Sequence, residues 1–216
     1  MVVLAKIVEW YPTSLMDIVN SFKFSSLLLI KKNIAYNIQY LQYLNRNIEE
    51  EKTTAVLYRI RYKIFIITSM SIIETIFITL LEERNLIPIE EWKDGEHHKE
   101  QINDDLIKVT FNRKRVAPYK KKIKFDEAIN LIMKNEVLGI SKDAEFVIRE
   151  LQKVRNHLHL DKAKSFSESN YNTFNKTTFF ITKISLYLLL KNKKISKDTK
   201  YIEFLKPSAE GYVSQL

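Results

Sequence analysis

A run of 18 residues, Ile64–Leu81, limits the fold more than any other stretch of the chain, because Glu74 is its only charged residue. The run just reaches the length of a transmembrane helix. Against insertion, Glu74 would lie near the centre of a bilayer, and five Ser and Thr side chains lower the hydrophobicity. A helix that is apolar on all sides is also what the centre of a helical bundle requires. We therefore expect the central helix of a soluble bundle, with a membrane-associated helical protein as the alternative.

Length and composition favour a single helical domain. A chain of 216 residues suits one sizeable core, and only 3 Gly and 4 Pro predict long helices with short connections. The absence of Cys excludes disulfides and cysteine-based metal or nucleophile chemistry, and it suits the reducing cytosol. The first residues, Met1–Lys6, lack the basic start and apolar run of a secretory signal. We expect residues 1–205 to form one domain, residues 206–216 a frayed tail, and the protein to be cytoplasmic.

The charge balance indicates a polyanionic partner. Lys and Arg total 35 against 26 Asp and Glu, which gives a formal net charge of +9. Nucleic acid is the commonest partner of such a chain, and RNA is the one we expect. A composition rich in Lys, Ile and Asn is also typical of AT-rich bacterial genomes, so the charge supports this prediction without carrying it.

Apolar spacing and punctuation predict the helices. In the first helical region, Tyr36, Tyr40 and Tyr43 are expected to be packing residues with their hydroxyls in water, rather than a base-stacking surface. Asp126 is expected to cap the third helix and Gly139 to end it. The predicted helical segments are Ser14–Asn47, Thr53–Asn85, Asp126–Val137, Glu145–Asp161 (capped by Ser141 or Asp143) and Tyr171–Asn192.

The stretch between the second and third helices is the least helical part. Trp92–Asp105 is polar and predicts a loop or a short helix; its adjacent His97 and His98 would face different ways, so we expect no metal site there. Ile107–Phe125 alternates apolar and charged residues and predicts a small basic β-hairpin. This hairpin is either a phosphate-contact surface or a solvated edge protected by lysine. Its candidate nucleic-acid-binding residues are Arg113, Lys114, Arg115, Lys120, Lys121 and Lys122.

The helix predicted at Glu145–Asp161 carries the only coherent chemical grouping in the chain. Arg155 and His159 are four residues apart, so a helix places them on one face, one turn apart, with Asn156 beside them. An Arg can stabilise charge on a phosphate, and a His can move a proton near neutral pH. The alternative is that these residues, with His157, merely complement the negative end of the helix.

The sequence LQKVRNHLHL, at residues 151–160, resembles the signature of the HEPN superfamily of all-α bundles, in which an Arg is followed by a polar residue and then a His. The resemblance extends to Arg61–Glu83, which is similar to the family's long central helix with an acidic residue, here Glu74. It also includes Phe125–Asn135, similar to the short helix before the motif. About half of the chain is covered. The usual family spacing is longer than the three residues between Arg155 and His159, and this departure concerns activity more than fold.

The resemblance implies a metal-independent endoribonuclease of a toxin or antiphage defence type, which needs no cofactor. His159 would be the general acid or base, and Arg155 would stabilise the phosphate. Asn156 would orient either the phosphate or His159. His157 is a weaker candidate, and Glu74 would support Arg155 by accepting its hydrogen bonds. Family members commonly form homodimers with a composite cleft, and an antitoxin or defence partner is also implied. The rival function is a non-catalytic module for dimerisation, nucleic-acid binding or partner binding.

The expected architecture is therefore all-α: an up-and-down, HEPN-like helical bundle with a small basic β-hairpin inserted around residues 107–125.

Overall fold

The computed structural model describes residues 11–25, 27–93, 97–102, 105–110, 113–156 and 170–207, with only the backbone given for those between 90 and 119 and for 170–171. The protein is mostly helical, as the sequence predicts. Its helices are α1 (Leu15–Ser21), α2 (Leu28–Glu50), α3 (Ala55–Glu83), α4 (Phe125–Lys134), α5 (Lys142–Asn156), α6 (Asn170–Thr173), α7 (Lys176–Leu190) and the 3₁₀ helix η3 (Lys200–Leu205).

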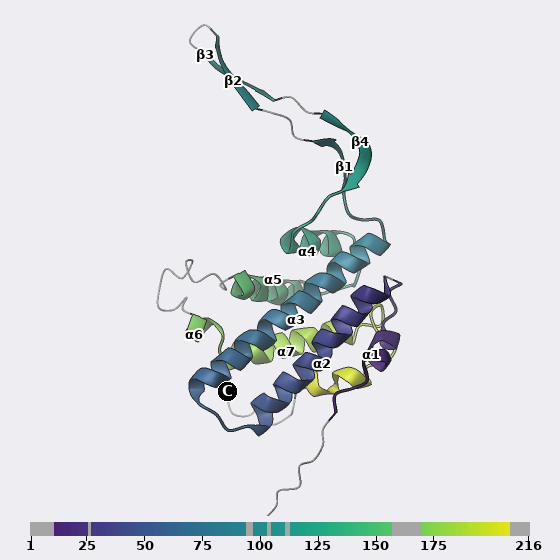
Figure 1. The fold of residues 1–216 in the computed structure, drawn as a ribbon, viewed down its shortest axis with the longest axis vertical. Helices are drawn as coiled ribbons and strands as arrows, with labels where there is room; N and C mark the ends of the chain where they lie inside the picture. Colours follow the sequence, from purple (N-terminus) through teal and green to yellow (C-terminus); the bar gives the residue numbers. More distant parts are fainter. Residues whose placement is uncertain are drawn as a thin grey trace, which may run out of the picture.

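Helix α3 is the centre of the bundle. It packs against α2, α4, α5 and α7, and Figure 1 shows it running diagonally through the helical part of the molecule. By length and composition α3 could cross a membrane, but 61 % of its most apolar 18-residue window is buried inside the protein. Phe65, Ile66, Met70, Ile73 and Ile76 are fully buried along it. Such burial agrees with the core helix of a soluble bundle.

Side-chain caps fix where several helices begin. The hydroxyl of Thr54 accepts a hydrogen bond from the backbone N–H of Leu57 at the start of α3. At the start of α5, the hydroxyl of Ser141 accepts a hydrogen bond from the backbone N–H of Ala144. Of the two residues predicted as the cap of this helix, Ser141 is therefore the one that caps it.

The predicted ends of α4 are wrong. Asp126 lies in its first turn and not at the N-cap, which is Lys124; Glu127 accepts a hydrogen bond from the Lys124 N–H at 3.4 Å. The helix ends at Lys134, and Glu136 adopts a positive φ of 46° just after it. Gly139, with a φ of 63°, belongs to the turn that leads into α5.

Three other expectations about helices need correction. The segment predicted at Ser14–Asn47 is two helices, because α1 ends at Ser21 and α2 begins at Leu28. The predicted helix at Tyr171–Asn192 is broken in two, because Phe174 turns into the core and Asn175 begins α7. The three tyrosines of α2 are not packing residues: Tyr36 is 67 % exposed, Tyr40 38 % and Tyr43 51 %. They follow the outer face of α2, opposite the buried face formed by Ile34, Ile38, Leu41 and Leu44.

Between α3 and α4 the chain forms an extended arm, which projects from one end of the bundle in Figure 1. Its strands are β1 (Ile89–Lys93), β2 (His97–Ile102), β3 (Asp105–Thr110) and β4 (Arg113–Lys120). β2 pairs with β3 and β1 pairs with β4, both antiparallel. The hairpin predicted around residues 107–125 is therefore wrong in its pairing, because β3 and β4 pair with the preceding strands and not with each other. The loop or short helix predicted at Trp92–Asp105 is wrong as well.

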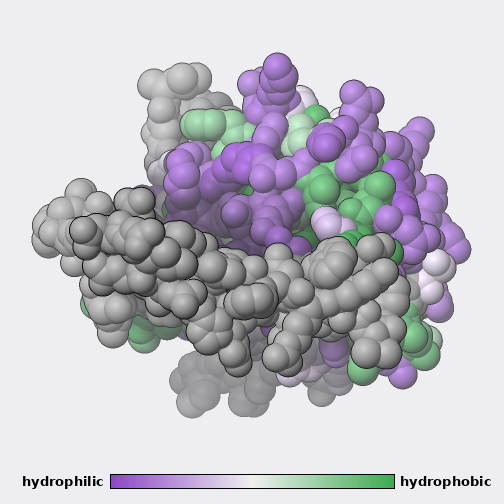
Figure 2. Space-filling view, turned by 90° about the horizontal axis from the view of Figure 1, so that it is seen from above, coloured by the Kyte–Doolittle hydropathy of each residue, from purple (hydrophilic) through white to green (hydrophobic). Residues whose placement is uncertain are grey.

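Apolar side chains also reach the surface. Figure 2 shows an area of apolar residues surrounded by hydrophilic ones, beside the part of the chain drawn in grey. Among the described residues, the exposed large apolar side chains include Leu27, Leu28 and Leu29 at the start of α2, and Ile181 and Leu188 on α7.

Candidate functional site at the end of helix α5

The packing of α5 brings its last turn over the middle of α3. Ile148 and Leu151 are buried on the inner face of α5, where the helix contacts α3 and α7. Arg155 follows Leu151 by four residues and so lies on the same side of the helix, one turn later. There its guanidinium meets Glu74, the single charge of the apolar run in α3.

Arg155 and Glu74 form an ion pair. The distance between Arg155 Nη1 and Glu74 Oε2 is 2.7 Å, and the two side chains are 27 % and 24 % exposed. The contact that the sequence suggested between these residues is therefore present. Since a carboxylate on an apolar helix is costly to bury without a partner, this pairing explains how the central helix tolerates Glu74.

The geometry leaves Arg155 able to bind a second anion. A guanidinium carries five N–H donors in a fixed plane, and Glu74 takes only one side of it. The side chain is partly exposed, so a phosphate oxygen can approach the remaining donors. Glu74 also fixes the direction of the guanidinium, which lowers the entropy that an incoming anion would have to remove.

Asn156 is the last residue of α5 and is exposed, so it can contact a ligand next to Arg155. The predicted residues His157 and His159 lie outside the described part of the chain. The site as described thus consists of Arg155, Asn156 and Glu74.

The predicted nucleic-acid-binding residues occur on and below the arm. Arg113, Lys114 and Arg115 lie on β4, where Arg113 pairs with Lys93 across the ladder. At the foot of the arm, Lys120 and Lys122 are exposed, and Lys121 forms an ion pair of 3.2 Å with Glu127.

The acidic residues of the arm were not part of the prediction. The preceding half of the arm contains Glu90, Glu91 and Glu100 on its two strands. Along the ladders Glu90 pairs with Tyr119 and Glu100 pairs with Ile107, so neither of these acids has a Lys or Arg as its direct partner. The exposed lysines at the foot of the arm, Lys120 and Lys122, are the candidates for phosphate contact whose side chains the structure describes.

Sequence reasoning missed a polar pocket between α2 and η3, lined by Gln42, Asn45 and Tyr201 among others. Its one signal in the sequence is that the amides Gln42 and Asn45 are interspersed with Leu41 and Leu44 on the predicted core face of α2. A buried amide at such a position needs a partner or a role. Among the described residues, no group of His, Asp and Glu is arranged to hold a metal ion.

No family model matches this chain, and neither a curated protein nor a solved structure is significantly similar to it.

Proposed function

We propose that this protein is an HEPN-like, metal-independent endoribonuclease. The observation that carries the proposal is Arg155, held by Glu74 at 2.7 Å at the exposed end of α5. It is supported by the net charge of +9 and by the HEPN-like sequence around the same residue. The bundle, with its arm as an insertion, would then be a single HEPN-like domain.

In the proposed reaction, the ribose 2′-hydroxyl attacks the adjacent phosphorus. His159 removes the hydroxyl proton as general base, or donates a proton to the departing 5′-oxygen as general acid. The P–O5′ bond breaks, and the products are a 2′,3′-cyclic phosphate and a 5′-hydroxyl. Arg155 stabilises the charge on the pentacoordinate phosphorus, and Asn156 orients the phosphate or His159. All groups required are side chains, so the reaction needs no metal and no cofactor.

One copy of the motif supplies one histidine, while efficient cleavage uses both a base and an acid. A homodimer that places two α5 ends in one cleft would supply both. The biological setting we propose is a cytoplasmic toxin or antiphage defence system, with RNA as substrate and an antitoxin or defence protein as partner.

The rival proposal is a non-catalytic module for dimerisation, nucleic-acid binding or partner binding. The same ion pair favours it, because Glu74 already neutralises much of the charge that Arg155 would offer to a phosphate. In this case, Arg155 and His159 would bind a phosphate or complete a network of contacts with another subunit.

Cleavage of total RNA and of a tRNA pool in EDTA separates the two proposals. The proteins to compare are wild type, His159→Ala, Arg155→Ala and, as a control on the same helix, Lys153→Ala, whose exposed ammonium pairs with Glu150. A ribonuclease predicts cyclic phosphate ends with wild type and Lys153→Ala, and loss of cleavage in the other two with fold and oligomeric state retained. If wild type does not cleave, while Arg155→Ala alters dimerisation or RNA affinity, the binding module is the better description.

A further inference from the structure

Three tyrosines lie exposed in a row on the outer face of α2. Tyr36, Tyr40 and Tyr43 are 67 %, 38 % and 51 % exposed, and their spacing by four and then three residues places them along one side of the helix. Within the described part of the chain, none of the three makes a hydrogen bond or a ring contact. These residues form the tyrosine row.

A row of exposed aromatic side chains indicates a binding surface. Single exposed apolar residues are ordinary, whereas contiguous ones mark sites of interaction. Tyrosine suits such a surface because its ring is apolar while its hydroxyl remains in water. Only two side-chain torsions position the ring, so little conformational entropy is lost when it makes a contact.

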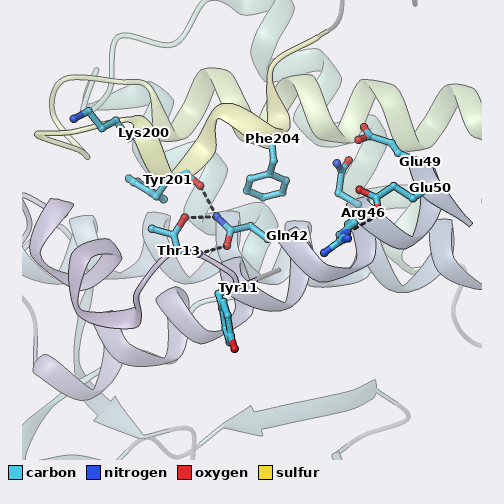
Figure 3. A pocket seen from close by; sticks show the side chains of 10 residues that line it. Tyr11, Thr13, Gln42, Arg46, Glu49, Glu50, Lys200, Tyr201 and Phe204 are labelled. Carbon is cyan, nitrogen blue, oxygen red and sulfur yellow. Dashed lines mark hydrogen bonds and ion pairs between the residues drawn. The ribbon is translucent and has the colours of Figure 1, made fainter. Parts of the chain in front are cut away.

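The inner face of α2 is held firmly, so the tyrosine row has a fixed backbone. Gln42 Nε2 donates to Thr13 Oγ1 at 2.8 Å and to the Tyr201 carbonyl at 3.0 Å, and Gln42 Oε1 accepts from the Thr13 N–H at 2.9 Å. Figure 3 shows these contacts, which join α2 to η3 and to the segment before α1. Ile38 and Leu41 are fully buried on the core face. Helix α2 therefore does not depend on its tyrosines for packing.

The spacing of the rings fits an extended single strand of nucleic acid. With a rise of about 1.5 Å per residue, Tyr36 and Tyr40 are about 6 Å apart along the axis, and Tyr40 and Tyr43 about 4.5 Å. Bases stacked within a helical strand are about 3.4 Å apart, so the rings are too far apart to match them. Successive bases of an extended strand lie further apart, and each can stack on one ring.

The charges of α2 around the tyrosine row are positive. Before Glu49, the charged residues of this helix are Lys31, Lys32 and Arg46. Lys32 is exposed and lies one turn before Tyr36, and within the described residues its ammonium makes no ion pair. Arg46 pairs with Glu50 at 2.6 Å. A strand that stacks on the tyrosines would therefore find a free cation for its phosphates at the Lys32 end of the row.

We propose that the outer face of α2 binds single-stranded RNA, with successive bases stacked on Tyr36, Tyr40 and Tyr43 and a phosphate on Lys32. Every base has a π face, so this surface selects unpaired RNA and not a particular sequence. The choice of RNA as the ligand rests on the proposed function, which the inference deepens by naming unpaired RNA as the substrate. Binding to the tyrosine row itself needs no cleavage.

The test measures fluorescence anisotropy of a labelled 2′-O-methyl oligonucleotide with the full-length protein. The methyl groups block attack by the 2′-oxygen, so binding is observed without cleavage. Two further probes are the duplex of this strand and an abasic strand of the same length, which keep the phosphates but offer no free base faces. Wild type is expected to bind the single strand roughly tenfold or more tightly than either, because stacking is absent from both.

The variants separate ring from charge. Replacing all three tyrosines with Ala should abolish the preference for the single strand, and replacing all three with Phe should keep it, because Phe retains the ring. Tyr36→Ala alone should weaken binding roughly fivefold or more. The matched control is Phe146→Ala on α5, where the ring is 64 % exposed and lies outside the tyrosine row; it should leave affinity unchanged. All these positions are exposed on helices, and Ala is the strongest helix former, so the Tm should be retained.

Three results would each overturn the proposal. They are equal affinity of wild type for the single strand and the abasic strand, equal affinity of wild type and the triple Ala variant for the single strand, and loss of the preference in the triple Phe variant. A change of oligomeric state in the triple Ala variant with RNA affinity retained would also overturn it and assign the tyrosine row to a protein contact. Failure of the proposed function looks different: wild type would not cleave RNA, while binding would still depend on the rings.

Discussion

Glu74 matters at the residue scale because it holds Arg155 in one direction at the exposed end of α5. The variant Glu74→Gln keeps the size and a hydrogen-bond acceptor but removes the charge. Since the pair is partly exposed, we expect unfolding free energy to fall by about 1 kcal/mol or less. If the proposed function is right, RNA cleavage should fall by roughly tenfold, because the guanidinium is no longer fixed. Chemical denaturation and cleavage rates measure the two effects.

The matched control is Glu145→Gln. Glu145 pairs with Arg149 at 2.6 Å on the same helix α5, and the two side chains are similarly exposed. The Glu145→Gln variant should lose a comparable amount of unfolding free energy and keep the full cleavage rate. Equal cleavage by the two variants would show that Glu74 serves only the fold.

Burial of Tyr201 makes the protein sensitive to alkaline pH. Desolvation raises the pKa of this phenol from 10.0, although the hydrogen bond with Ser196 acts in the opposite direction. A folded-state pKa raised above the unfolded value means that its stability contribution is complete below pH 10 and is lost as the pH rises through the raised value. We expect Tyr201→Phe to flatten the decline of Tm above pH 10. Thermal unfolding of wild type and Tyr201→Phe from pH 8 to pH 11 measures the decline of Tm. If the decline is the same in both proteins, groups other than Tyr201 cause it.

The sequence could identify individual residues only where a pattern isolates them. Glu74 stands out because it is alone in an apolar run, and Arg155 because it lies in a motif, so their contact could be anticipated. Asn45 gave a weaker signal, as an amide among the apolar residues on the predicted core face of α2. The pocket that it lines is formed together with η3, more than 150 positions away in sequence, and no local spacing records such a distance.

At the element scale, the start of α7 depends on one side chain. Asn175 Oδ1 accepts from the Thr178 N–H at 2.9 Å, and its Nδ2 donates to the Asn172 carbonyl at 2.9 Å. Asn175→Ala removes both contacts and should lower unfolding free energy by about 1 kcal/mol. Thr177→Ala, at an exposed position of the same turn, should change it by less than about 0.5 kcal/mol. Urea denaturation compares them; equal losses would mean that the cap contributes nothing.

Helices could be predicted where they bury an apolar face against the core, as α2, α3 and α5 do. The strands of the arm could not be predicted in this way, for a physical reason. Its strands pair mainly with one another, so the stretch Ile89–Ile102 has no alternation of core-facing apolar residues. The break before α7 was missed because Phe174 continues the apolar pattern even though the backbone turns there.

At the scale of the whole molecule, the fold class follows from composition and one apolar run, whereas the pairing of distant segments does not. Few Gly and Pro and a run of 18 residues with one charge already favour a helical bundle. Strand pairing places β1 against β4, and the exposed Lys120 and Lys122 lie at the foot of the arm. The net charge of +9 supports the proposed polyanionic partner, and the candidate place for the contact is the foot of the arm.

The last prediction concerns that place. Lys120, Lys122 and Lys124 are exposed at the foot of the arm, while Lys121 is paired with Glu127. If the three exposed lysines contact phosphates, replacing them with Gln should reduce the slope of log K against log salt by about 2 for single-stranded RNA. The affinity for RNA at low salt should also fall, by the same factor for every RNA sequence. Filter binding over a range of salt concentrations measures both quantities.

A control of equal charge is Lys23→Gln, Lys193→Gln and Lys197→Gln combined. These lysines are also exposed, and the backbone hydrogen bond between Lys23 and Ile195 shows that they lie together in another part of the fold. Both triple variants lower the net charge from +9 by the same amount, so a non-specific attraction would reduce the slope equally in the two. A reduction confined to the first variant locates the RNA at the foot of the arm; a reduction confined to the second would move it to the end of the bundle where α1 meets Ile195.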